Sequence, residues 1–186
     1  MAEKFLLREL PHYDSLQERA VRYPDLDVGA VEATLSLLRV AGDVLEGMGA
    51  HLARQGISQG RFLVLILLSR RCAEAGMSPS DLAQCLDVSR ANITGLLDGL
   101  EKDGFVRRRQ HPEDRRALTI HLTVAGHDFL EAMLPEHYRR IAGLMVHLAP
   151  DERRELTQLL GKVARGVGAL RDQEWTPELE FASELI

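Results

Sequence analysis

The chain has 186 residues, 45% of them hydrophobic and 27% charged, with a net charge of −5. This composition is ordinary for a globular protein of one domain, and two cysteines are too few for a disulfide scaffold. The longest apolar run, residues 62–68, is far shorter than the roughly 20 residues that span a bilayer. We therefore expect a cytoplasmic protein with no signal peptide and no membrane segment.

The first 57 residues are expected to be helical. Residues 1–27 hold apolar residues before and after Pro11, which indicates an N-terminal helical extension of two short helices. Its apolar face needs a covering surface, which is either a partner chain or the body of its own chain. Residues 28–55 predict one long helix, because apolar residues recur along one face and Gly56 can end it.

The next helix is expected to begin after Ser58, which is suited to cap it. Residues 62–68 are seven consecutive apolar residues, a pattern that a buried strand would also give. We favour a helix because polar residues continue the segment to Glu74 and because Gly76 can terminate it. This helix should be buried nearly all round.

Residues 78–104 carry the signals of two short helices joined by a tight turn. A hydroxyl at Ser78, a proline at position 79 and a carboxylate at Asp81 together mark the start of the first helix. Ser89 caps the second helix, which Gly104 ends and whose inward positions are Ile93, Leu96, Leu97 and Leu100. This pattern predicts a helix-turn-helix.

Two strands and a basic loop are predicted after the second helix. Residues 105–109 and 118–122 read as strands, and the second alternates Leu118, Ile120 and Leu122 against Thr119 and His121. Between residues 105 and 118 five arginines stand against two acids, which gives a local net charge of +3 in an acidic chain. Because binding depends on where basic residues gather, this hairpin predicts a DNA-binding wing.

Short or hydrogen-bonding residues near the start of the second helix permit close approach to base edges, as a recognition helix requires. We assign Arg107, Arg108 and Arg109 to phosphate contact, although a run of charges is often only solvated. Arg116 can enter a minor groove, held by Asp114. The predicted DNA-binding residues are Ser78, Ser80, Ser89, Arg90, Ala91, Asn92, Thr94, Arg107, Arg109, Asp114, Arg115 and Arg116.

At this point the sequence resembles the MarR family of winged-helix repressors. The matching motifs are residues 82–89, the joint Leu100–Val106, the wing Asp114–Arg116 and the segment Leu122–Gly126, within a resemblance over residues 30–170. It implies a mainly α fold with a small β-hairpin wing. Residues 58–123 would form the winged helix-turn-helix, and residues 28–57 and 124–172 would form dimerisation helices on either side.

The C-terminal part predicts two more helices and a tail. One helix runs from Val124 to about Leu148 and is bent or locally broken at Pro135, and the last starts at Pro150 and ends near Leu170. Residues 173–186 are an acidic tail. Apolar faces at both ends of the chain predict a homodimer, which would present two recognition helices to a pseudo-palindromic operator.

The resemblance also implies a transcriptional regulator, usually a repressor, that a small molecule such as a phenolic or aromatic acid releases from double-stranded DNA. An effector between the dimer helices and the winged unit would shift the spacing of the two recognition helices. Arg39 or His51 is a candidate to bind it. The alternative for Arg39 is a solvated or salt-bridged side chain on a helix flank.

No enzyme motif is present: we find no nucleophile elbow, no phosphate-cradling glycine loop and no His-x-x-x-His pair. We therefore predict no catalytic residues, no cofactor and no metal site. Cys85 is expected to be a buried structural thiol, whereas Cys72 lies beside two arginines. A redox- or metal-responsive regulator of the same fold, and a protein-interaction module that does not bind DNA, remain the alternatives.

Overall fold

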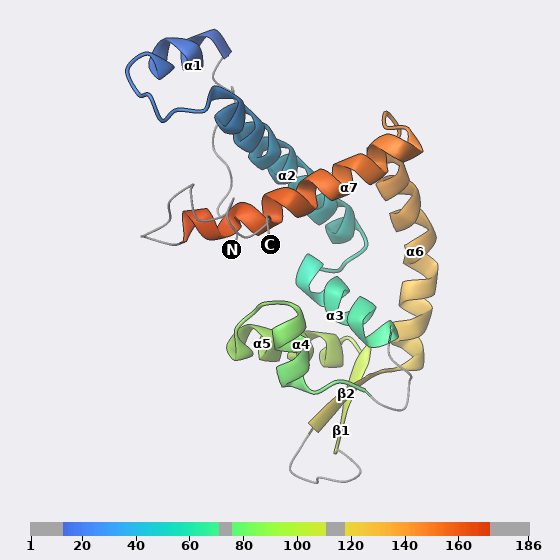
Figure 1. Cartoon of the computed structure of the whole chain (residues 1–186). Helices are drawn as coiled ribbons and strands as arrows, with labels where there is room; N and C mark the ends of the chain where they lie inside the picture. The colour runs from blue at the N-terminus through green and yellow to red at the C-terminus, as the bar shows by residue number, and fades with distance from the viewer. Residues whose placement is uncertain (1–12, 71–75, 111–117, 172–186) are drawn as a thin grey trace, which may run out of the picture. The chain divides into compact units, whose positions relative to one another are not determined.

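The computed structural model describes residues 13–70, 76–110 and 118–171 and divides the chain into two compact units, residues 1–133 and 134–186. Its elements are helices α1 (Tyr13–Ala20), α2 (Val28–Arg54), α3 (Gln59–Ser69), α4 (Pro79–Cys85) and α5 (Arg90–Lys102), strands β1 (Val106–Gln110) and β2 (Leu118–Leu122), helices α6 (Val124–Leu144) and α7 (Pro150–Arg165), and the 3-10 turn η1 (Gly166–Leu170) (Figure 1). This is the predicted fold class, a mainly α winged helix-turn-helix.

Helices α1 and α2 pack against each other within the chain, and Leu16 of α1 is buried. The body of the same chain therefore covers this part of the N-terminal extension, whereas the earlier of its two predicted helices lies outside the described residues. The long helix α2 begins at the cap residue Asp27, whose carboxylate accepts the Ala30 N–H at 2.9 Å. It ends just before Gly56, whose φ of +76° favours glycine.

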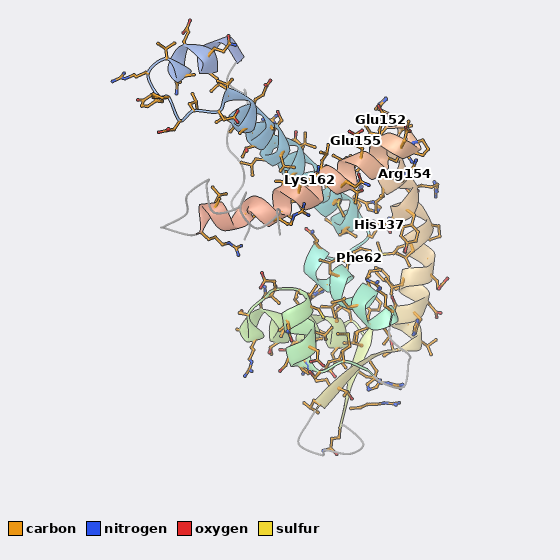
Figure 2. All side chains as sticks on the ribbon, viewed as in Figure 1. Phe62, His137, Glu152, Arg154, Glu155 and Lys162 are labelled. Atoms are coloured by element: carbon orange, nitrogen blue, oxygen red, sulfur yellow. The ribbon has the colours of Figure 1, made fainter. Side chains whose placement is uncertain are left out.

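The apolar run of residues 62–68 is helical, as predicted. Ser58 caps α3 by accepting the Arg61 N–H at 3.4 Å. The buried side chains of the helix are Phe62, which Figure 2 labels, Val64, Leu65 and Leu68. The helix ends at Ser69, earlier than predicted, and residues 71–75 lie outside the described part of the chain. Leu63 is 38% exposed, so burial is not complete all round the helix.

Helices α4 and α5 form the predicted helix-turn-helix, and each begins at the predicted serine. The Ser78 hydroxyl accepts the Asp81 N–H at 3.1 Å, while the Asp81 carboxylate accepts the Ser78 N–H at 3.4 Å. Asp87, with a φ of +50°, reverses the chain between the helices, and the Ser89 hydroxyl then accepts the Asn92 N–H at 3.2 Å. Apolar residues of both helices, Leu82, Ile93, Leu97 and Leu100, are buried.

Strands β1 and β2 pair antiparallel, from Val106 opposite Leu122 to Gln110 opposite Leu118. A third segment, not predicted, joins this sheet: Met77 exchanges two backbone hydrogen bonds with Ile120, of 3.1 and 2.8 Å. Burial in β2 does not follow the alternation of its apolar and polar residues. Leu118 is exposed, whereas Thr119 and His121 are buried and pair with each other, the Thr119 hydroxyl oxygen lying 2.9 Å from Nε2 of His121.

Helix α6 begins in the first unit and continues into the second, with Pro135 inside it. The predicted boundary near Leu148 is wrong by four residues, because the helix ends at Leu144 and a hydrogen-bonded turn follows. Helix α7 has no buried residue: its charged side chains, among them Glu152, Arg154, Glu155 and Lys162 (Figure 2), are exposed. Its apolar side chains Leu159, Leu160 and Val163 are also exposed.

No helix among the described residues is both long enough and apolar enough to cross a bilayer.

Candidate nucleic-acid interface

The first two turns of α5 present a polar, open surface. The outward residues Arg90, Ala91, Asn92, Thr94 and Gly95 are all exposed, and the opposite side of the same helix is buried through Ile93 and Leu97. Hydrogen bonding within the helix engages the Thr94 hydroxyl, which donates to the Arg90 carbonyl at 2.8 Å. The side chains left to face a partner here are an amide, a guanidinium and a methyl group, which suit the edges and phosphates of a duplex.

Serine residues stand at the starts of both helices of the motif. Ser80 and Ser89 are exposed and Ser78 is half-buried. The hydroxyl oxygens of Ser78 and Ser89 accept backbone N–H groups, but each hydroxyl keeps its own proton and can still donate it to a phosphate oxygen. Capping and phosphate contact are therefore compatible at these positions.

Strand β1 separates the three consecutive arginines onto two faces. Arg107 and Arg109 are exposed, whereas Arg108 points the other way, toward α5. The Arg108 guanidinium pairs with the carboxylates of Asp98 and Glu101, the latter at 3.2 Å, and its backbone N–H donates to Glu101 at 3.3 Å. Arg108 therefore joins the strand to the helix, which differs from its assignment to phosphate contact on sequence alone.

A second arginine holds α5 from the other side. Arg61 of α3 forms an ion pair with Asp103, with 2.9 Å between Nη1 and Oδ2. Sequence reasoning missed Arg61, Asp98, Glu101 and Asp103, because these pairs join residues up to 42 positions apart. The one available signal was the alternation of side chains along a strand, which places Arg108 on the opposite face from Arg107 and Arg109.

The predicted wing tip, with Asp114, Arg115 and Arg116, lies outside the described residues. Its strands are described, and both pack on the helix-turn-helix: α5 contacts β1, and α4 contacts β2 (Figure 1). The structure therefore brings together the helix starts, the open face of α5 and the base of the hairpin in the first unit.

The two candidate ligand residues do not share a site within one chain. Arg39 pairs with Asp43 one turn further along α2, with 3.1 Å between Nε and Oδ2, and His51 is buried in the last turn of the same helix. Twelve helical residues separate them, which is about 18 Å along the axis and about 120° around it. The observed ion pair matches the salt-bridged alternative for Arg39.

Cys85 departs from the prediction of a buried thiol. It is the last residue of α4 and is exposed, because the buried side of this short helix is made by Leu82 and Ala83. Cys72 lies outside the described residues. Among the residues that are described, no three His, Cys, Asp or Glu side chains gather in a way that could hold a metal ion.

Comparison with known proteins gives a consistent result. Residues 57–118 match the sequence profile of the MarR family. The transcriptional repressor YetL of Bacillus subtilis is 37% identical over 166 residues, which cover 89% of this chain and 99% of YetL. The transcriptional repressor MprA of Escherichia coli is 33% identical over 153 residues, which cover 82% of this chain and 86% of MprA.

Solved structures share the fold. The crystal structure of the MepR–DNA complex of S. aureus matches with a TM-score of 0.63 and 19% sequence identity, over 72% of this chain and 95% of MepR.

Proposed function

Since the chain belongs to the MarR family of transcriptional regulators, we propose that it is a homodimeric repressor that binds a pseudo-palindromic operator and leaves it when a small molecule binds. The observation that carries this proposal is the open polar face of the first two turns of α5, beside a hairpin strand that exposes Arg107 and Arg109. MprA and YetL are both named transcriptional repressors, and MepR was crystallised with DNA, which supports the same function here.

In the proposed complex α5 lies in the major groove with its N-terminal turns against the bases. The Asn92 amide can bond an adenine edge in a bidentate manner, and Arg90 can bond a guanine edge or a phosphate. Ser78, Ser80, Ser89, Arg107 and Arg109 contact phosphates, while Asp114 orients Arg115 and Arg116 of the wing toward the minor groove.

Dimerisation is proposed from the apolar side chains that the second unit leaves exposed. Ile141 and Leu144 of α6, with Leu160 and Val163 of α7, are between 40% and 52% exposed. A second copy of the chain would cover such faces, and the two-fold axis would place the two α5 helices at half-sites about 10 base pairs apart.

The effector is proposed to be an aromatic carboxylate or another phenolic compound that binds one spacing of the two α5 helices better than the other. The factor by which such a ligand lowers the affinity for DNA is at most the ratio of the ligand's own affinities for the two states. The candidate side chains for it stay Arg39, which here pairs with Asp43, and His51.

The test is selection of bound duplexes from a random pool, followed by fluorescence anisotropy with the selected duplex and a scrambled duplex of the same composition. We expect tight, salt-sensitive binding with a clear preference for the selected sequence, and release by at least one compound in a screen of aromatic carboxylates. Absence of any DNA binding at low ionic strength would overturn the proposal.

Asn92→Ala is the matching residue test. Losing the amide should relax selectivity at one base position of each half-site and cost about 1–3 kcal/mol of discrimination there, without changing the salt slope. Repeating the selection with the variant measures this directly, and an unchanged consensus sequence would remove Asn92 from the readout.

A further inference from the structure

Helices α3 and α5 make a close contact in which each offers a glycine to a side chain of the other. Gly60 of α3 lies under Leu96 of α5, so that a Cβ added at position 60 would be 3.1 Å from the nearest methyl carbon. Gly99 of α5 lies under Arg61 of α3, and a Cβ added at position 99 would overlap the guanidinium group. The adjacent residues Gly60 and Arg61 of α3 therefore contact α5 at Leu96 and Gly99, about one helical turn apart.

Both the backbone and the side chain of Arg61 are held by other residues. Its backbone N–H donates to the Ser58 cap at 3.4 Å, and its Nη1 lies 2.9 Å from Oδ2 of Asp103 at the C-terminal end of α5. The two side chains are 32% and 42% exposed, so the pair is partly shielded from water. A partly shielded pair seated on a glycine restricts the position of a helix more than a solvated surface pair does.

We propose that Arg61 is a positioning residue for DNA recognition: by holding the last turn of α5 against α3, it sets the direction of the helix whose first turns read the bases. The inference rests on the proposed function. Helix α5 is 13 residues, or roughly 20 Å, long, so a small tilt at its C-terminal end displaces Asn92 at the other end. Bidentate contacts to base edges tolerate little displacement, whereas attraction to phosphates tolerates more.

Two other roles for Arg61 predict different measurements. Removing an arginine that contacts a phosphate would weaken binding to all duplexes equally. It would also reduce the salt slope, the slope of log affinity against log salt concentration, by about one. An arginine that only stabilises the fold would lower the melting temperature and leave the relative affinity of the folded protein for two duplexes unchanged. A positioning residue lowers the ratio of selected to scrambled affinity and leaves the salt slope as it was.

The experiment measures binding of the full chain to the selected and the scrambled duplex by fluorescence anisotropy, at several salt concentrations and well below each variant's melting temperature. Arg61→Gln should lower the ratio of the two affinities about three- to tenfold, which lies in the lower part of the range of coupling between contacting residues. Asp103→Asn should lower the ratio by a similar factor. The double variant should lower the ratio no further than the single variant with the larger effect, because the two changes remove the same ion pair.

Gly99→Ala gives an independent test with the arginine kept. Alanine favours a helix more than glycine does, so the change alone should raise the melting temperature. At position 99, however, the new methyl group also displaces the Arg61 guanidinium, so the ratio of selected to scrambled affinity should fall as it does in Arg61→Gln. In the Arg61→Ala background, Gly99→Ala should leave the ratio unchanged. Gly47→Ala on α2, where a Cβ meets nothing within 4 Å, controls for helix propensity.

The outcomes separate the inference from its premise. If the unmodified chain binds neither duplex or shows no preference, the proposed function is overturned and the inference with it. If the unmodified chain prefers the selected duplex and both Arg61→Gln and Gly99→Ala keep that preference in full, only the inference is overturned. A reduced salt slope in Arg61→Gln would also overturn it, in favour of direct phosphate contact.

Discussion

At the residue scale, the neighbours Arg107 and Arg108 show how one peptide step changes the role of a side chain. Arg107 is exposed on one face of β1, while Arg108 is turned to α5 and pairs with Asp98 and Glu101. If Arg108 left these carboxylates, two negative charges would face outward from the helix that is proposed to bind DNA. We therefore expect the two arginines to support DNA binding in different ways.

The pair Arg107→Gln and Arg108→Gln tests this. Arg107→Gln should weaken binding to every duplex and reduce the salt slope by about one. Arg108→Gln should also weaken binding, but adding Asp98→Asn should restore much of the affinity, because it removes the charge that Arg108 had neutralised. Anisotropy titrations across a salt series measure both effects. If Asp98→Asn brings no recovery, Arg108 contacts DNA directly.

At the element scale, a single hydroxyl connects three elements of the winged unit. Thr123 follows β2, donates to the Gly104 carbonyl at 2.6 Å, and accepts the Gly126 N–H of α6 at 3.0 Å. Gly126 in turn packs against the Phe105 carbonyl so closely that no Cβ would fit, and the Phe105 and Phe129 rings stack with 4.7 Å between their centroids. The end of α5, the sheet and the start of α6 thus meet at one point.

Thr123→Val keeps the shape of the side chain but removes the hydrogen bonds of its hydroxyl to the Gly104 and Phe105 carbonyls and from the Gly126 N–H. We expect the free energy of unfolding to fall by about 1–2 kcal/mol, measured by urea denaturation. Thr157→Val is the matched control: its exposed hydroxyl only donates to the Arg153 carbonyl within α7, and the change should stay within about 0.5 kcal/mol. Equal effects in the two variants would show that Thr123 has no special role at this junction.

The helices could be predicted from sequence because their signals are local. Ser58, Ser78 and Ser89 each mark a helix start, and Gly56 and Gly104 follow helix ends with φ of +76° and +77°. The sheet was predicted less completely. Met77 joins it from a position 43 residues before its partner Ile120, and this pairs an edge of β2 for which the sequence holds no local signal. Pairs such as Arg61 with Asp103 carry no local signal at all.

At the scale of the whole molecule, the two units differ in how they bury apolar side chains. The first has a core that includes Leu52, Leu65, Leu82, Leu100 and Ile120, each at 0% exposure. In the second, α7 contributes no buried residue although it carries an apolar stripe. Sequence periodicity predicts such a stripe, but it does not say whether the same chain or a second copy covers it, and dimerisation therefore stays a proposal.

Leu160→Glu tests that proposal. A carboxylate on the face shared by Leu160, Val163 and Val167 should turn the dimer into a monomer at micromolar concentration, because an unpaired charge would have to be buried. Light scattering coupled to size exclusion measures the mass, and affinity for a two-half-site duplex should fall with it. Gln158→Glu, at an exposed polar position of α7, should remain a dimer. Dimeric mass in both variants would place the interface elsewhere.

The bridge between Met77 and Ile120 has a mechanical consequence for the winged unit. Met77 is tied to the middle of β2 by two hydrogen bonds, and the very next residue, Ser78, is the cap of α4. A displacement of β2 is thus transmitted through Met77 and one peptide unit to the N-terminal cap of α4. In the proposed complex, the paired strands at the base of the hairpin and the helix-turn-helix would therefore move together, so that a duplex deformed under one would also be deformed under the other.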